Sequence, residues 1–119
     1  MSTIKSAELF DKMGPVLEKS GADIVKKVGA VFLFEIRATK EAEPVFYTVD
    51  LKNGSGKISK GKEGTIDTTF VMLDDDILQL AAGKLNPQNA FMTGKMKIKG
   101  NMGKAMKFTP DVFPKDAKL

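Results

Sequence analysis

Cysteine, histidine and tryptophan are absent from this chain of 119 residues, and tyrosine and arginine each occur once. The first two absences exclude disulfides, zinc sites built from these side chains, thiol nucleophiles and imidazole acid–base catalysis. A chain without cysteine needs no oxidising compartment, so we expect an intracellular protein. Because the usual catalytic side chains are missing, we expect no enzymatic activity, no cofactor and no metal ion.

Long hydrophobic runs are also missing. The first ten residues lack the apolar core of a signal peptide, and no apolar run approaches the roughly 18 residues of a membrane span. Apolar residues still make up 42% of the chain, with eight phenylalanines, which is enough to fold around a core. We therefore expect a monomeric protein with one domain over residues 1–119. Its residues 109–119 should form an extended tail, because they contain two prolines and no periodicity.

The periodicity of the apolar residues changes along the chain from helix to strand and back. Helical spacing predicts a helix that starts at Ser6, has a kink or a short break at Gly14–Pro15 and ends at Ser20–Gly21. A second short helix should follow and close near Gly29. Alternating and β-branched segments predict five strands, and capping residues predict three later helices. This order indicates an α+β fold, a five-stranded sheet with helices packed on one face. The predicted strands cover about residues 30–38, 43–52, 57–60, 65–73 and 95–100, and the later helices about residues 74–84, 86–94 and 101–108.

Positive charge is concentrated in the last third of the chain. Residues 84–119 carry eight lysines and two aspartates, a net charge of +6, whereas residues 1–83 have a net charge of −2. A basic patch of this kind attracts the phosphates of lipid headgroups, phosphorylated ligands or nucleic acid. A nucleic-acid-binding module is therefore an alternative function, although one arginine and one tyrosine offer little for base contacts and stacking.

Methionine is clustered in the same region, since residues 91–108 hold four of the seven methionines. Flexible thioether side chains suit either an ordinary core or a cavity that adapts to varied apolar guests, and periodicity shows only which residues share a side. In the predicted strand 95–100, Met96 faces inward and the lysines face outward. In the helix that follows, Met102, Ala105 and Met106 fall on the side opposite the lysines.

Carboxylates offer two further candidate sites, for a metal ion and for a catalytic base. The three side chains of Asp74–Asp76 point in different directions at a predicted helix start, so we interpret them as stabilising that helix rather than binding a metal ion. Glu35 and Asp50 lie on predicted strands and could be buried bases. We favour solvated or ion-paired roles for both, because such roles are more common.

The last three residues are Ala117, Lys118 and Leu119. A small residue, a basic residue and a leucine match the Ser-Lys-Leu type of peroxisomal address. The tail before them contains prolines and should keep the signal exposed. We therefore predict the peroxisomal matrix as the location, with a cytosolic fraction, and the peroxisomal import receptor as a partner.

Several blocks of the sequence, in this order, resemble the sterol carrier protein 2 family, also called non-specific lipid-transfer proteins. The strongest block is "GKLNPQNAFMTGKMKIKGNMGKAMK", and "VKKVGAVFLFEI", "YTVDLKNGSGK" and the terminal "AKL" support it. The resemblance covers nearly the whole chain as a stand-alone domain. It implies a mostly antiparallel five-stranded sheet covered on one face by about five helices, with a hydrophobic tunnel between the two layers.

The resemblance also implies a function, non-covalent lipid carriage. Members of the family bind fatty acids, fatty acyl-CoA and sterols, and we expect this chain to bring them to membranes or peroxisomal enzymes, with transient contact to anionic membranes. The family's tunnel lining carries over to Phe34, Gln88, Phe91, Met96, Met102 and Met106. The basic rim expected beside the tunnel consists of Lys95, Lys97, Lys99, Lys104 and Lys107.

Overall fold

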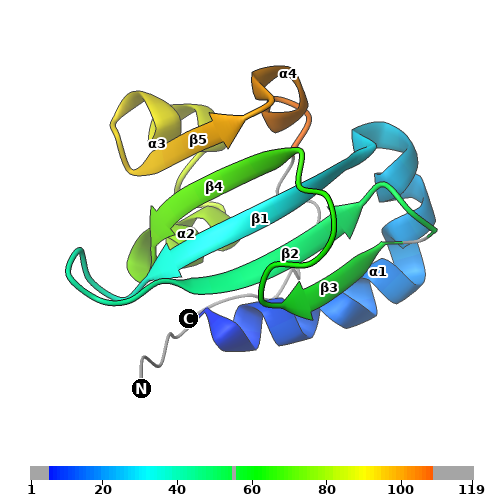
Figure 1. Cartoon of the computed structure of the whole chain (residues 1–119), viewed down its shortest axis with the longest axis horizontal. Helices are drawn as coiled ribbons and strands as arrows, with labels where there is room; N and C mark the ends of the chain where they lie inside the picture. Colours follow the sequence, from blue (N-terminus) through cyan, green and yellow to red (C-terminus); the bar gives the residue numbers. More distant parts are fainter. Residues whose placement is uncertain (1–5, 55, 109–119) are drawn as a thin grey trace.

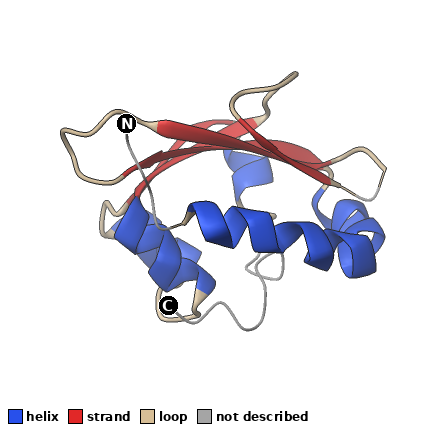
Figure 2. Cartoon of the chain, turned by 90° about the horizontal axis from the view of Figure 1, so that it is seen from below, coloured by secondary structure: helices blue, strands red, loops and turns tan. Residues whose placement is uncertain are grey.

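A computed structural model shows one five-stranded sheet with helices on one side, and it describes residues 6–54 and 56–108 (Figures 1 and 2). The tail over residues 109–119 lies outside the described residues. No helix in the described ranges is long and apolar enough to cross a bilayer. The strands are β1 (Ala30–Arg37), β2 (Val45–Leu51), β3 (Lys57–Lys60), β4 (Thr68–Leu73) and β5 (Met96–Gly100). The helices are α1 (Ala7–Val28), α2 (Asp74–Ala81), α3 (Pro87–Met92) and α4 (Met102–Ala105).

The strands lie in the order β3-β2-β1-β4-β5, so β1 is central and β3 and β5 are the edges. Three of the four neighbouring pairs are antiparallel, and β1 and β4 are parallel. Phe34 in the middle of β1 lies opposite Tyr47 of β2 and Phe70 of β4. The five-stranded, mostly antiparallel sheet predicted from the sequence is therefore confirmed.

Alternation along β1 separates the two faces of the sheet, as predicted. Phe32, Phe34 and Ile36 are buried on the face that packs against the helices, and Glu35 lies on the outer face. Leu33 also points outward but is buried. A segment over residues 61–67 crosses that face, and the hydroxyl of Thr48 holds it by donating to the Gly61 carbonyl oxygen at 2.6 Å (Figure 1).

Helix α1 is continuous over 22 residues, so the predicted helix end at Ser20–Gly21 is wrong, and there is no break at Gly14–Pro15. Pro15 removes the amide that would bond to the carbonyl of Asp11. Both residues are exposed, so water can satisfy that carbonyl. Burial of one uninterrupted apolar stripe outweighs the cost of the hydrogen bond lost at Pro15. The described residues therefore form four helices rather than about five. The buried stripe runs past Pro15 without a change of side, through Met13, Leu17, Gly21, Ile24 and Val28.

Aspartates occupy the first turn of α2, as predicted, and one of them serves a second helix as well. Ser6 is the N-cap residue of α1, but its side chain makes no capping hydrogen bond. Its backbone amide donates instead to Oδ1 of the buried Asp74 at 2.9 Å. One carboxylate thus lies at the positive ends of both α1 and α2. The caps of the short helices are conventional, since Asn86 and Asn101 accept backbone hydrogen bonds at the starts of α3 and α4.

Candidate functional site

Aromatic and aliphatic side chains fill the interior between the helices and the sheet. Phe34 lies at its centre, with its ring centroid 5.6 Å from Phe10, 5.3 Å from Phe70 and 5.5 Å from Phe108. Tyr47 stacks on Phe10 at 4.1 Å. Burial raises the pKa of the Tyr47 hydroxyl, and the negative charge of Asp11 raises it further. The centre of the interior therefore presents uncharged apolar surface.

Strand β5 bounds this interior at one edge of the sheet. Met96 is 2% exposed and pairs with Met72 of β4, and Ile98 is partly buried against the core. Alternation in β5 is therefore as predicted, with these side chains inward and the lysines outward. Of the six predicted lipid-lining residues, Phe34 and Met96 lie in the core.

Four predicted lining residues instead lie at the surface. In α3 the inward residue is Ala90, whereas Gln88 is exposed and Phe91 is 45% exposed. Met102 and Met106, at the two ends of α4, are 44% and 64% exposed. The lipid-lining role of all six residues stays a prediction.

On the side of α4 that was predicted to face inward, Ala105 is buried but the two methionines are exposed. Ala105 and Phe108 are buried, and the Phe108 ring packs within 5.5 Å of Phe32, Phe34 and Phe70. Sequence reasoning included Phe108 at the end of the predicted helix over residues 101–108 but gave it no inward role, so it missed the residue that joins α4 to the sheet. The available signal was the spacing of three between Ala105 and Phe108, which places them on one side of a helix.

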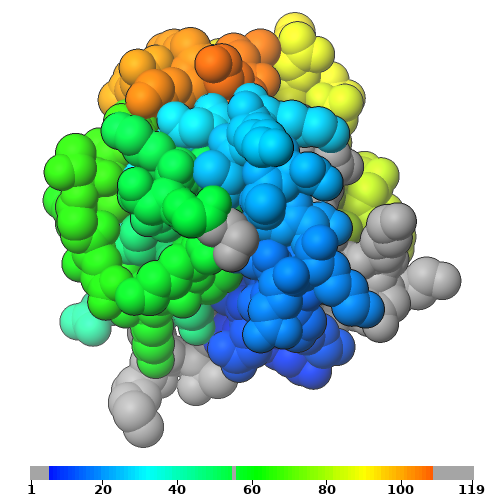
Figure 3. Space-filling view, turned by 90° about the vertical axis from the view of Figure 1, so that its right-hand side faces the viewer, coloured from blue at the N-terminus to red at the C-terminus, as the bar shows by residue number. Residues whose placement is uncertain are grey.

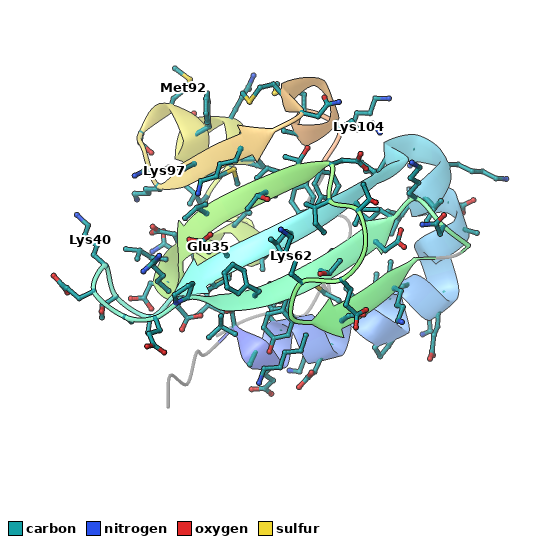
Figure 4. All side chains as sticks on the ribbon, in the orientation of Figure 1. Glu35, Lys40, Lys62, Met92, Lys97 and Lys104 are labelled. Carbon is teal, nitrogen blue, oxygen red and sulfur yellow. The ribbon has the colours of Figure 1, made fainter. Side chains whose placement is uncertain are left out.

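The five lysines predicted as a basic rim are not equivalent. Lys97 and Lys99 project from the outer face of the sheet, next to Val71 and Thr69 of β4. Lys95 and Lys107 are exposed at the two ends of this region. In contrast, Lys104, labelled in Figure 4, is partly buried. Its Nζ lies 3.4 Å from Oδ1 of Asp67. The ion pair leaves Lys104 less available to a ligand than the other four.

The outer face of the sheet holds a hollow of about 460 Å³ beneath the segment over residues 61–67. Its lining includes Asp50, whose carboxylate accepts hydrogen bonds from Asn53 and from the amide of Lys52. Burial works against the negative charge, but these hydrogen bonds outweigh it and hold the pKa of Asp50 below its ordinary value. Lys57 and Glu63 pair across the same hollow at 4.0 Å. This polar hollow does not suit an apolar chain.

The candidate carboxylates have structural partners. Asp50 is engaged as described, and Glu35 lies 3.4 Å from the guanidinium of Arg37. Asp74 accepts from the amide of Ser6. Over residues 6–54 and 56–108, no group of three or more acidic side chains has the arrangement of a metal site.

Residues 10–111 match the SCP-2 sterol transfer family. An Arabidopsis thaliana protein named Sterol carrier protein 2 is 44% identical over 118 residues, which cover 98% of this chain and 96% of that protein. The Sterol carrier protein 2 of Rattus norvegicus is 40% identical over 97% of this chain, but this chain spans only 21% of that longer protein. The chain belongs to the SCP-2 sterol transfer family, as the sequence blocks predicted.

Solved structures have the same fold. The apo form of Sterol Carrier Protein 2 from Yarrowia lipolytica is 34% identical, with a TM-score of 0.80 over 91% of this chain and 97% of that chain. Sterol Carrier Protein-2 from Aedes aegypti, in complex with a C16 fatty acid (palmitate), is 25% identical, with a TM-score of 0.69 over 93% of this chain and 96% of that chain. These matches lend no support to the nucleic-acid alternative.

Proposed function

We propose that residues 1–119 form a single lipid-binding domain that carries fatty acids, fatty acyl-CoA and sterols and performs no covalent chemistry. The observation that carries the proposal is the apolar interior around Phe34, where aromatic and methionine side chains pack between the helices and the sheet. Apolar contact of this kind favours aliphatic chains and ring systems alike and discriminates weakly between chain lengths. The palmitate complex of the Aedes aegypti relative supports the same ligand class.

The division of the predicted lining residues between core and surface suggests a path for the ligand. Phe34 and Met96 lie at the inner end, and Phe91, Met102 and Met106 lie at the outer end beside β5. We propose that an apolar chain enters between α3 and α4 and that its polar head stays at the surface. Exposed lysines there suit a carboxylate or the phosphates of acyl-CoA.

A charge on this path tests the proposal. Phe91→Asp should weaken the binding of a fluorescent long-chain fatty acid at least tenfold, because a charged group must then be desolvated beside the apolar chain. Asn89→Asp is the matched control, since it adds the same charge to an exposed position of α3. Fluorescence titration in vesicle-free buffer measures both affinities, and circular dichroism checks that both variants fold.

Equal affinity of the two variants would argue against a path beside Phe91. Failure of the unmodified protein to bind any fatty acid, acyl-CoA or sterol would overturn the proposed function as a whole. Organic extraction of the purified protein, followed by mass spectrometry, identifies which of these ligands it carries.

We further propose that Ala117, Lys118 and Leu119 direct the protein to the peroxisomal matrix, where it would present lipids to enzymes. The signal is recognised as a free carboxyl-terminal peptide, so it should act without the folded domain. Residues 109–119 appended to a fluorescent protein should therefore give punctate peroxisomal fluorescence, and deletion of Leu119 should return it to the cytosol. Cytosolic fluorescence from both fusions would refute this address.

A further inference from the structure

Four large apolar side chains are exposed at one end of the molecule. They belong to α3 and to the two ends of α4, which lie together around β5 (Figures 1 and 3). Met92 is the most exposed of them at 78%, and in Figure 4 it points away from the sheet. Exposed apolar residues that occur together, rather than singly, mark interaction surfaces. We call this group the methionine face; it consists of Phe91, Met92, Met102 and Met106.

Strand β5 determines the shape of the methionine face. Both α3 and α4 contact this edge strand. The strand has five residues, so the two helices are separated by about 15 Å along it. The exposed side chains therefore form a short strip along one edge of the sheet, suited to shallow contact with a broad apolar layer.

The segment that forms the methionine face carries positive charges only, and the nearby Asp67 is paired with Lys104. No aspartate or glutamate occurs between Asp76 and Asp111 in the sequence. Lys97 and Lys99 project from the sheet face beside the strip, and further exposed lysines lie at its ends. This arrangement matches the interface of an anionic bilayer, where acyl chains lie beneath a layer of phosphates.

Helix α1 is the other amphipathic element large enough to lie on a membrane, but it has neither an exposed apolar side nor an excess of positive charge. Its apolar stripe is buried against the sheet. The remaining surface carries four acidic and four basic side chains, so it has no net charge. Neither apolar insertion nor attraction to anionic lipid favours this helix.

We propose that the methionine face is the surface with which this protein docks on anionic lipid bilayers. Its apolar side chains enter the boundary between headgroups and acyl chains, and Lys97 and Lys99 contact lipid phosphates. The inference rests on the proposed lipid-carrier function and deepens it. Docking in this orientation brings α3 and α4, the helices that flank the proposed ligand path, to the membrane from which lipid is loaded.

The lack of tryptophan allows a direct test of the docking orientation. Met92→Trp places a single indole on the methionine face, and Ala22→Trp places one on the exposed side of α1. Both variants are titrated with vesicles of phosphatidylcholine and phosphatidylserine that carry brominated acyl chains. The emission of Met92→Trp should shift to shorter wavelength and be quenched, and that of Ala22→Trp should remain unchanged.

Matched lysine pairs test the electrostatic part. Lys97→Gln/Lys99→Gln and Lys12→Gln/Lys19→Gln each remove two positive charges. The first pair lies beside the methionine face, and the second lies in the first part of α1, away from α3, β5 and α4 (Figure 1). Partition onto phosphatidylserine vesicles should fall by roughly fivefold per lysine for the first variant and much less for the second. Met92→Gln, which keeps the length of the side chain but not its apolar character, should also weaken partition.

Three outcomes overturn the inference: quenching of Ala22→Trp instead of Met92→Trp, equal loss of partition for the two lysine pairs, or self-association that Met92→Gln abolishes. The last outcome would assign the methionine face to a second copy of the chain. Fatty-acid binding in vesicle-free buffer, measured on the same preparations, separates the two proposals. If the unmodified protein binds fatty acid but not vesicles, the carrier function stands and the docking surface falls.

Discussion

Asp67 is a residue whose contacts join segments that are far apart in the sequence. Its amide donates to the carbonyl of Val31 and its Oδ2 accepts from the Val31 amide, both at 2.9 Å. Its carbonyl oxygen accepts from the amide of Asn101 at 3.0 Å, and its Oδ1 pairs with Lys104. The Val31 hydrogen bond lowers the pKa of Asp67, burial opposes the effect, and Lys104 adds to it. The start of β1 and helix α4 are thus both held by one residue, through its side chain and its backbone.

Replacing Asp67 by alanine should lower the free energy of unfolding by about 2 kcal/mol at neutral pH, because a charged acceptor and its hydrogen bonds are lost. The folded-state pKa lies below the ordinary value of 3.8. The contribution of Asp67 is therefore complete above that value and is lost as the pH falls through the lower folded-state pKa. Urea unfolding between neutral and strongly acidic pH measures the difference between the variant and the unmodified protein.

Asp23→Ala, on the exposed side of α1, serves as the control for the change in net charge. A difference for Asp67→Ala that stays constant down to the most acidic pH would contradict this role of the carboxylate. The sequence did not single out Asp67, because its partners lie 36 and 37 residues away and no local pattern connects them.

At the scale of the elements, α1 shows how tertiary packing overrides a local signal. Proline inside a helix removes a hydrogen bond, and it restricts the residue before it, here Gly14. The helix continues through both residues because its buried stripe keeps the same register against the sheet. Pro15 therefore weakens α1 without ending it.

Pro15→Ala should raise the free energy of unfolding by about 1–3 kcal/mol, because it restores an amide donor and removes the restriction on Gly14. A Cβ added at Gly14 meets no atom within 4 Å. Gly14→Ala should therefore add about 0.5–1 kcal/mol in the Pro15→Ala background, and less where Pro15 is retained. Urea unfolding of the single and double variants measures these gains; a loss of stability in Pro15→Ala would show that the proline fits α1 better than alanine does.

The strands were predictable to within a few residues, since alternation in β1 and β5 reflects which side chains meet the helices. The orientation of α4 was not. A helix of four residues presents methionines on one side and Ala105 and Phe108 on another, and both sides are apolar. Which side packs depends on the aromatic rings of β1 and β4, far away in the sequence. Periodicity identifies the two sides of such a helix but cannot choose between them.

At the scale of the whole molecule, the uneven charge of the sequence becomes a feature of one end. The basic last third folds into α3, β5 and α4, which gather along one edge of the sheet (Figure 1). Composition predicted the positive charge of this region, because charge adds up along a continuous segment. It did not predict the exposed methionines beside it, because exposure depends on how the segment lies against the rest of the fold.

The parallel pairing of β1 with β4 has a consequence for the order in which the chain can fold during synthesis. The strands β1, β2 and β3 are consecutive antiparallel neighbours and can pair as soon as they have left the ribosome. A growing chain that stops before Thr68 lacks β4, so the second edge of the central strand has no partner. That edge lies beside the phenylalanines of β1 and is the kind of surface on which incomplete chains associate. The Asp74 carboxylate, which accepts a hydrogen bond from the amide of Ser6 at the start of α1, is also synthesised late. The first helix to be made therefore gains this hydrogen bond only after β4 has been synthesised.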